Sequence, residues 1–325
     1  MYSKLQYNDY DLNQWNEFAS RFEFVTVAHN PSLISIIEKS FHFKSSYFFI
    51  KDNENNIVGI FPSYIVKGNI ISIPHFSYGD IILDEEEQNV NNIRNEIIGS
   101  NYEIRSFNPF SKHIDTSKIM CYLNLKDSEE EQWAYWKSKL RSQIRKGIKN
   151  GVEVKIGGEE LLSTFYQVYS KNMHDLGSPV LGISFFKNIL NLYKYGEAKI
   201  FVAYKNNINL AVGLVLTYQN FSEVCWASSL KEYNSLNANM VLYWEMIKYA
   251  VNNHYNYFSF GRSTKDSNTH RFKKQWNPNE KQLFFNYSSL PKINIRKYTF
   301  LAGMWRKLPL SFANKLGPYI SSRIY

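Results

Sequence analysis

Residues that could do chemistry gather in the segment 257–276, which reads YFSFGRSTKDSNTHRFKKQW. Phe258 and Phe260 alternate with smaller or polar neighbours, which predicts a buried strand, and Gly261 would let the chain turn into a polar loop. A basic segment with aromatic neighbours follows, comprising Arg271, Phe272, Lys273, Lys274 and Trp276. Because cations held beside flat apolar surfaces suit a developing negative charge, we predict a reaction or binding site here.

Transfer of an acyl group to an amine is one reaction that this segment could support. The acceptor amine must lie close to the donor carbonyl, and the oxyanion that develops must be stabilised. Lys273, held by Phe272 and Trp276, could stabilise that oxyanion or protonate the leaving oxygen. Arg262 and Ser263 could bind a phosphate or a carboxylate of either substrate. The alternative for Lys273 is a surface lysine on a short helix.

The order F-G-R-S, a polar spacer, then F-K and W resembles the Fem family of peptidyltransferases, including the FemAB-like proteins encoded near bacterial polysaccharide loci. The resemblance covers the chain from about Phe24 to its end. It implies two acetyltransferase-like (GNAT-like) modules in one chain and an aminoacyl-tRNA as the usual donor. It also implies that the reaction centre lies at the Phe-Lys pair, which is Phe272 and Lys273 in this sequence.

Two shorter segments also resemble the family. Tyr78 and Asp80 lie in IPHFSYGD, which is similar to a YGG-like turn with an aspartate in place of the second glycine. His174 and Asp175 precede Leu-Gly-x-Pro, as in a short signature of the FemAB-like proteins. The resemblance implies substrate binding at these four residues, and the alternative for His174 and Asp175 is capping or packing.

The elements that would position this site follow each other in an order that occurs twice. YFFIKDNENNIVGIFPSYIV and KIFVAYKNNINLAVGLVLTY both predict strand, turn and strand, and each half then offers a helix and a strand, YEIRSFNP and YFSFGRS. This order indicates a duplicated unit of about 100 residues. We therefore predict an α/β (α+β) fold of two tandem GNAT-like modules, each a mostly antiparallel or mixed central sheet flanked by helices. The predicted modules are 1–127 and 128–290, with a basic amphipathic C-terminal tail at 291–325.

A helix predicted at 129–150 carries a dense group of cations. The segment KSKLRSQIRKGIKN has six cations and no acid, and Arg141, Arg145 and Lys149 recur every four residues along one edge. Because no acid offsets the repulsion between these like charges, an external anion is expected, such as phosphates of tRNA or of a glycosyl pyrophosphate. The alternative is a solvated face. We call Arg141, Arg145 and Lys149 the basic edge.

The tail mixes cations with large apolar residues, and it either lies at a membrane interface or packs on the second module. A net charge of +9 and a pI near 9.2 also predict an anionic partner, such as tRNA, a nucleotide sugar or acidic lipid. Two cysteines in apolar segments, and the absence of a signal-peptide pattern or a membrane-length apolar run, predict a cytoplasmic protein. If the tail binds lipid, the protein would be peripheral on the inner face of the membrane.

Several other site types find no support in the sequence. The chain has no HExxH, paired CxxC, P-loop, GxSxG or GxGxxG motif, and its seven histidines are scattered. We therefore expect no metal and no tightly bound cofactor. No general base is obvious, although Asp266 and Glu245 are available.

The donor and acceptor are less closely defined. An acyl-CoA enzyme of the GNAT class usually has a glycine-rich turn at the position that here reads SLKEYNSLNANM, without glycine. This argues against coenzyme A as the donor, and the resemblance implies transfer from aminoacyl-tRNA to an amino group of a cell-envelope precursor, such as a peptidoglycan peptide, a lipid-linked precursor or a surface sugar. One alternative is an acyl-CoA-dependent N-acyltransferase of amino sugars in polysaccharide biosynthesis. Another is a non-catalytic module that binds a polyanion.

Overall fold

A computed structural model describes residues 3–6, 12–84, 93–94, 98–289 and 299–323. Its helices are α1 (Leu12–Ser20), α2 (Leu33–Phe41), α4 (Glu129–Tyr135), α5 (Ser138–Lys149), α6 (Leu162–Asp175), α7 (Ile183–Leu192), α8 (Ala238–Asn252), α9 (Asn268–Lys274), α10 (Thr299–Trp305) and α11 (Leu310–Ser321). Short 3-10 helices are η2 (Val27–His29), η3 (Glu159–Leu161) and η4 (Lys231–Leu236).

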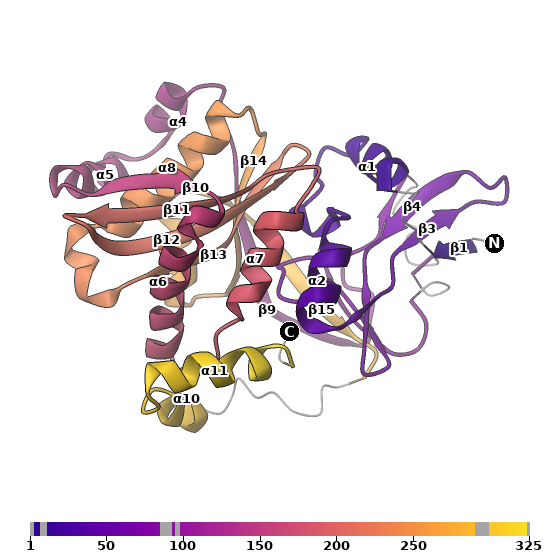
Figure 1. The fold of residues 1–325 in the computed structure, drawn as a ribbon. Helices are drawn as coiled ribbons and strands as arrows, with labels where there is room; N and C mark the ends of the chain where they lie inside the picture. The colour runs from indigo at the N-terminus through magenta and orange to yellow at the C-terminus, as the bar shows by residue number, and fades with distance from the viewer. Residues whose placement is uncertain (1–2, 7–11, 85–92, 95–97, 290–298, 324–325) are drawn as a thin grey trace.

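The strands of the described residues form a large mixed sheet and a small one (Figure 1). The large sheet has the order β10-β11-β12-β13-β14-β9-β15-β8-β6-β5-β2, and the small sheet has the order β1-β3-β4-β7. The strands are β1 (Ser3–Gln6), β2 (Lys44–Ser45), β3 (Phe48–Lys51), β4 (Ile57–Phe61), β5 (Tyr64–Val66), β6 (Asn69–Ile71), β7 (Ile82–Leu83), β8 (Tyr102–Ser106), β9 (His113–Asn124), β10 (Glu153–Gly157), β11 (Ala198–Lys205), β12 (Ile208–Tyr218), β13 (Phe221–Ser229), β14 (Tyr257–Thr264) and β15 (Asn279–Tyr287).

Both halves of the chain contain antiparallel strands followed by a parallel strand pair. In the C-terminal half, β11, β12 and β13 are antiparallel neighbours, and β13 then pairs in parallel with β14, the strand after helix α8. In the N-terminal half, β5 and β6 are antiparallel, and β6 pairs in parallel with β8. The predicted fold of two tandem GNAT-like modules with mixed sheets is therefore confirmed.

The two halves exchange their last strands. β9, from the N-terminal half, lies between β14 and β15, whereas β15, from the C-terminal half, lies between β9 and β8. β9 thus pairs with β14, the strand that precedes β15, and β15 pairs with β8, the strand that precedes β9. The two exchanged strands also pair with each other. The sheet runs without a break across the predicted module boundary at residue 127.

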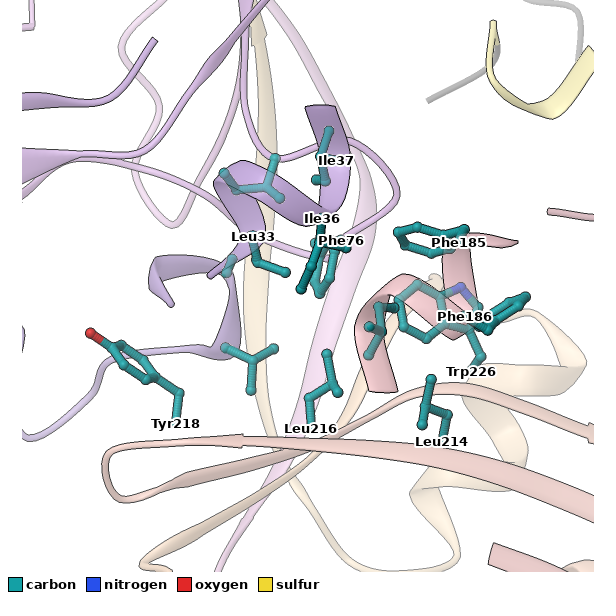
Figure 2. Packing of buried hydrophobic residues seen from close by; sticks show 14 of the residues in the cluster. Leu33, Ile36, Ile37, Phe76, Phe185, Phe186, Leu214, Leu216, Tyr218 and Trp226 are labelled. Atoms are coloured by element: carbon teal, nitrogen blue, oxygen red, sulfur yellow. The ribbon is translucent and has the colours of Figure 1, made fainter. Parts of the chain in front are cut away.

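Successive side chains of the C-terminal strands point to opposite faces of the sheet and pack into two different hydrophobic cores. On β11, Ile200 and Val202 pack with helices α6 and α7, whereas Phe201 and Ala203 pack with α5 and α8. Figure 2 shows the first of these cores, in which Leu33 and Ile36 of α2 meet Phe185, Phe186 and Trp226 from the other half. Residues from both halves therefore form one continuous core, and the halves are fixed against each other.

Several elements differ from the sequence-based expectation. The helix predicted at 129–150 is two helices, α4 and α5, because Trp136 is extended (φ −88°, ψ 151°) and its buried indole donates to the Trp276 carbonyl at 3.1 Å. The second strand expected within YFFIKDNENNIVGIFPSYIV is divided into β4 and β5, which lie in different sheets. Gly151 ends α5 with φ +79°, as expected of a C-terminal cap. Most of the helix expected at 85–100 lies outside the described residues.

Across the described residues, no helix combines the length and the apolar character needed to cross a membrane.

Candidate active site at the separation of two parallel strands

The candidate site lies where β13 and β14 stop pairing. The two strands are in register only at Phe221 with Tyr257, Ser222 with Phe258, and Glu223 with Ser259. Beyond this point β14 shifts its register with β9, between Ser259 and Arg262. The sequence predicted that the strand would turn into a loop at Gly261, but β14 continues to Thr264 and Gly261 forms an irregularity within it.

Gly261 is required for this irregularity. Its φ is +68°, a conformation that other residues rarely adopt, and a Cβ there would lie 3.3 Å from the Ser77 hydroxyl. The distorted backbone turns the carbonyl groups of Gly261 and Arg262 toward the same ammonium group. In a regular strand, successive carbonyl groups point to opposite edges. In β14, the carbonyl oxygens of Gly261 and Arg262 converge on one point instead.

Lys273 supplies that ammonium group. It is only 4% exposed, and its Nζ donates to the carbonyl oxygens of Gly261 and Arg262, each at 2.9 Å. Burial lowers the pKa of Lys273 to about 8. Nζ has three protons, and the third has no hydrogen-bond partner among the described residues. Lys273 is thus a buried group that can give up a proton near neutral pH, and not a surface lysine.

Glu223 is the carboxyl group of the site, and sequence analysis missed it. The residue is 2% exposed on β13, and burial raises its pKa, although hydrogen bonds from Ser259 and Ser77 and the charges of Lys273 and Arg262 oppose that shift. The signal was present as a single acid inside the apolar segment FSEVCW. The base candidates from the sequence lie elsewhere: Asp266 is exposed, and Glu245 pairs with Lys248 at 2.8 Å.

Arg262 connects this site to the N-terminal half. Its Nη1 donates to the Phe76 carbonyl at 2.7 Å, and its backbone N–H donates to the Ser77 hydroxyl at 3.1 Å. The Arg262 guanidinium also lies 5.7 Å from the centre of the Phe285 ring on β15. The neighbouring Ser263 has a buried hydroxyl with no hydrogen-bond partner in the described part of the chain. The site is therefore built at the junction of the two halves.

Aromatic residues support Lys273 from the α8 side. Phe272 packs edge-on against Tyr243 with ring centres 5.0 Å apart, and Trp276 is fully buried against Trp136 at 5.1 Å. The buried indole N–H of Trp276 has no hydrogen-bond partner within the described residues. Arg271, predicted to bind substrate, is exposed on α9. The aromatic flanks predicted for Lys273 are thus in place, with Trp276 in the core.

The basic edge lies on α5, which packs on α8 through Gly147. A Cβ at Gly147 would lie 3.0 Å from the Asn237 carbonyl, so the two helices approach closely. Arg145 and Lys149 are exposed and Arg141 is half-buried, while the Arg145 guanidinium lies 5.3 Å from the Trp133 ring centre. Among the described residues, none of the three cations of the basic edge has a carboxylate partner.

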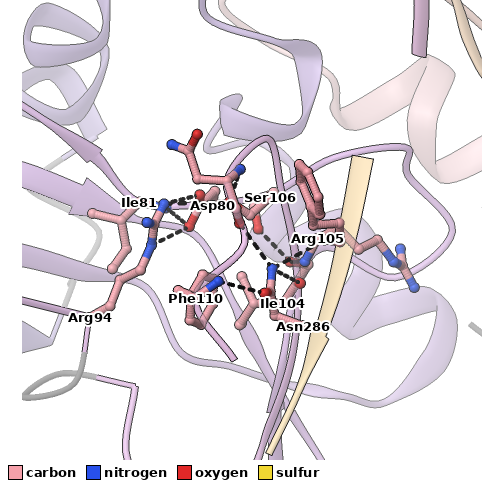
Figure 3. Close-up of polar contacts among 12 residues, drawn as sticks. Asp80, Ile81, Arg94, Ile104, Arg105, Ser106, Phe110 and Asn286 are labelled. Atoms are coloured by element: carbon pink, nitrogen blue, oxygen red, sulfur yellow. Dashed lines mark hydrogen bonds and ion pairs between the residues drawn. The ribbon is translucent and has the colours of Figure 1, made fainter. Parts of the chain in front are cut away.

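Tyr78 and Asp80 lie in the N-terminal half and follow Ser77 closely in the sequence. Tyr78 stacks on Phe107 with ring centres 4.1 Å apart. Asp80 is buried in an ion pair with Arg94 and also accepts from the Ile81 backbone N–H (Figure 3). The charge of Asp80 is therefore used within the protein, which favours a structural role for this residue.

His174 and Asp175 end α6 and contact neighbouring segments. His174 Nε2 lies 2.8 Å from the Leu308 carbonyl, next to α10, and the carboxylate of Asp175 pairs with Lys171. His174 and Asp175 therefore lie beside the C-terminal helices.

Of the residues predicted from the sequence, the structure brings Arg262, Ser263, Phe272, Lys273 and Trp276 together.

The described residues include no group of three or more His, Cys, Asp or Glu side chains placed to hold a metal ion.

Comparison with known proteins agrees with the fold. Residues 137–274, which make up most of the C-terminal module, match the acetyltransferase (GNAT) domain family. No curated protein matches the sequence. Among solved structures, FemX superimposes with a TM-score of 0.67 at 13% identity, covering 92% of this chain and 100% of FemX.

Two further structures share the fold. The tandem GNAT protein from the clavulanic acid biosynthesis pathway has a TM-score of 0.52 at 8% identity, covering 90% of this chain and 99% of its own. The L-PGS structure from Bacillus licheniformis has a TM-score of 0.55 at 9% identity, covering 94% of this chain and 98% of its own. The chain thus has the tandem GNAT fold, and its resemblance to the Fem family is confirmed at the level of the fold.

Proposed function

We propose that the protein transfers an aminoacyl group from aminoacyl-tRNA to an amino group of a cell-envelope precursor or a surface sugar. The observation that carries the proposal is the pair of buried groups at the separation of β13 and β14. Burial raises the pKa of Glu223 and lowers the pKa of Lys273 to about 8, so the carboxylate is a stronger base and the ammonium a stronger acid than the free side chains.

The two groups match the proton transfers that the reaction requires. The acceptor amine attacks the carbonyl carbon of the aminoacyl ester, a C–N bond forms, and the C–O bond to the tRNA ribose breaks. Glu223 takes the proton that the nitrogen loses, and Lys273 donates a proton to the ribose oxygen that leaves. A proton passing from Glu223 to Lys273 then restores both groups for the next reaction.

Two observations favour tRNA over coenzyme A as the carrier of the acyl group. The segment between β13 and α8 has no glycine, forms the helix η4, and is followed by the close contact of α5 with the start of α8. Backbone N–H groups at this helix start are therefore less open to a pyrophosphate than in a glycine-rich turn. The unpaired basic edge on the adjacent helix α5 suits the phosphates of a nucleic acid.

The acceptor is proposed from the resemblance and from the fold. The Fem resemblance implies an amino group on a cell-envelope precursor, such as a peptidoglycan peptide, and the FemX structure shares the fold along its whole length. We propose that the acceptor enters from the side of Arg262 and Ser77, where the two halves meet. An amine at this point would lie beside Glu223, which has to accept its proton.

Single turnovers with labelled aminoacyl-tRNA test the proposal. Glu223→Gln and Lys273→Met should each reduce transfer to a panel of muramoyl-peptide and amino-sugar precursors by at least about 100-fold, because each removes a proton-transfer group. Binding of the charged tRNA should remain. Glu245→Gln is the matched control, since it neutralises a carboxylate on α8 outside the site, and it should leave the rate unchanged.

Three results would contradict the proposal. Transfer from acyl-CoA but not from aminoacyl-tRNA would replace the donor. Tight tRNA binding without transfer by the wild-type protein to any acceptor in the panel would favour a module that only binds polyanions. Full activity of both Glu223→Gln and Lys273→Met would remove the site from the reaction.

A further inference from the structure

At the end of the molecule formed by α10 and α11, several large apolar side chains are exposed to an unusual extent. Phe300 is 74% exposed and Met304 is 54% exposed on α10, while Phe312 and Tyr319 are 53% and 59% exposed on α11. Leu176, at the end of α6, is 58% exposed beside Gly177, whose Cα approaches Ala302 of α10. Isolated apolar residues are common on surfaces, but a group at one end of a molecule marks an interaction site.

The spacing of these residues gives each helix one apolar stripe. Phe300 and Met304 are four residues apart on α10, and Phe312 and Tyr319 are seven residues apart on α11, so each pair lies on one side of its helix. Figure 1 shows both helices at the same end of the molecule, next to the end of α6. We call Leu176, Phe300, Met304, Phe312 and Tyr319 the apolar end face.

The opposite side of α11 holds the tail on the protein. Ala313, Gly317 and Ser321 recur every four residues and are buried. A Cβ at Gly317 would lie 2.9 Å from Val180, and the Ser321 hydroxyl donates to the Val180 carbonyl at 3.0 Å. Helix α11 is therefore packed on the protein, in agreement with one of the two alternatives that the sequence left for the tail, and this packing fixes the stripe with Phe312 and Tyr319 outward.

The charge of this segment selects the partner. The described part of the tail, residues 299–323, contains four cations, Arg306, Lys307, Lys315 and Arg323, and no acid. A second copy of the chain would bring the same positive charge against this face. An RNA would satisfy the cations but would leave the apolar side chains without a partner. An anionic lipid surface offers both negative headgroups and an apolar layer.

We propose that the apolar end face inserts into an anionic lipid surface. Phe300, Met304 and Phe312 enter the boundary between headgroups and acyl chains, and the described cations Arg306, Lys307, Lys315 and Arg323 contact the headgroups. Arg306 and Lys307, which directly follow α10, are exposed, as is Lys315 on α11. Arg323 lies 4.0 Å from the Tyr319 ring centre, so a cation and an aromatic side chain of this face act at the same place. This inference does not depend on the proposed reaction.

Co-sedimentation with vesicles tests the proposal. The full-length protein should bind vesicles of phosphatidylcholine and phosphatidylglycerol in equal parts, and should bind vesicles of phosphatidylcholine alone at least about tenfold more weakly, because several cations face the headgroups. The double variant Phe300→Ser, Phe312→Ser should reduce binding to the anionic vesicles by at least about tenfold, because two large apolar side chains no longer insert. Rising salt should weaken the wild-type interaction.

The matched control is Ile156→Ser, Ile208→Ser, which removes two exposed apolar residues from β10 and β12 and should leave vesicle binding unchanged. Equal binding by the Phe300→Ser, Phe312→Ser variant would overturn the proposal, and so would the absence of wild-type binding. A concentration-dependent dimer that the double variant abolishes, without vesicle binding, would assign the face to a second copy instead. Circular dichroism of both double variants verifies that they are folded.

Discussion

Lys273 and Glu223 show how one backbone irregularity creates a site. Gly261 turns two carbonyl oxygens toward the Lys273 ammonium, and these hydrogen bonds compensate in part for removing the charge from water. Arg262, the next residue, is tied to the N-terminal half through the Phe76 carbonyl. Two consecutive residues, Gly261 and Arg262, therefore link Lys273 to the junction between the halves.

The pKa of Lys273 predicts a change of stability with pH. The value of about 8 in the folded protein lies below the ordinary value of 10.5, so between these values the unfolded chain binds more protons than the folded one. The free energy of unfolding should therefore rise with pH in this window, by about 2 kcal/mol from pH 8 to pH 10. Denaturant titrations at a series of pH values measure it.

Lys273→Met should abolish this rise. Lys281→Met is the matched control, because Lys281 is a half-buried lysine whose pKa is also lowered by burial, but which lies outside the site. That variant should retain most of the rise. An unchanged pH dependence in Lys273→Met would show that the Lys273 ammonium titrates as an exposed lysine does.

At the level of single residues, sequence reasoning found the Phe-Lys pair and its aromatic flanks but not the carboxyl group. Phe272 and Lys273 lie in one short segment with cations and aromatics, which makes them visible. Glu223 lies 50 residues earlier on another strand, and only the pairing of β13 with β14 brings it to Ser259. Contacts across a sheet are set by tertiary pairing, which no local pattern contains.

Among the elements, α5 combines a packed side with the basic edge. Leu140 and Ile144 are buried against α8, and Gly147 allows the close approach, so the helix cannot rotate to pair its cations with acids elsewhere. Of the cations that periodicity placed along one edge, Arg145 and Lys149 are exposed and Arg141 is half-buried. Periodicity did not predict the break before Ser138, because Trp136 leaves the helix for a tertiary contact with Trp244 and Trp276.

The basic edge predicts a salt-dependent interaction with tRNA. Changing Arg141, Arg145 and Lys149 to Gln together should weaken binding and reduce the slope of log affinity against log salt by roughly 2 to 3, since about one counterion is released per phosphate contact. Fluorescence anisotropy with labelled tRNA across a salt series measures this slope. The control changes Lys39, Lys44 and Lys67 to Gln, three exposed lysines of the N-terminal half, and should leave the slope unchanged. A slope shared by both variants would mean that tRNA binds through net charge alone.

The whole molecule is defined by the exchange of β9 and β15. Sequence repetition predicted two modules, and the parallel pairs β6 with β8 and β13 with β14 confirm the repeat. The exchange itself had no sequence signal, because β9 and β15 would show the same apolar alternation beside either partner. Only the register of the complete sheet shows which strands are neighbours.

The exchange predicts how the protein behaves when it is cut. A fragment of residues 1–126 leaves both edges of β9 unpaired, and β8 loses β15, so neither this fragment nor 127–325 should fold alone. Co-expressed, the two fragments should associate and recover the circular dichroism spectrum of the intact chain. Co-purification through a tag on one fragment detects the complex. A monomeric 1–126 fragment with cooperative unfolding would contradict this prediction.

During synthesis on the ribosome, the exchange of strands delays completion of the sheet. β8 ends at Ser106, but its neighbour β15 is complete only at Tyr287. At bacterial or eukaryotic rates of translation, the intervening residues take on the order of ten seconds or more to appear. During that interval one edge of β8 remains open on the nascent chain, and β9 has no neighbour until β14 ends at Thr264. The N-terminal half becomes complete only after most of the C-terminal half has emerged.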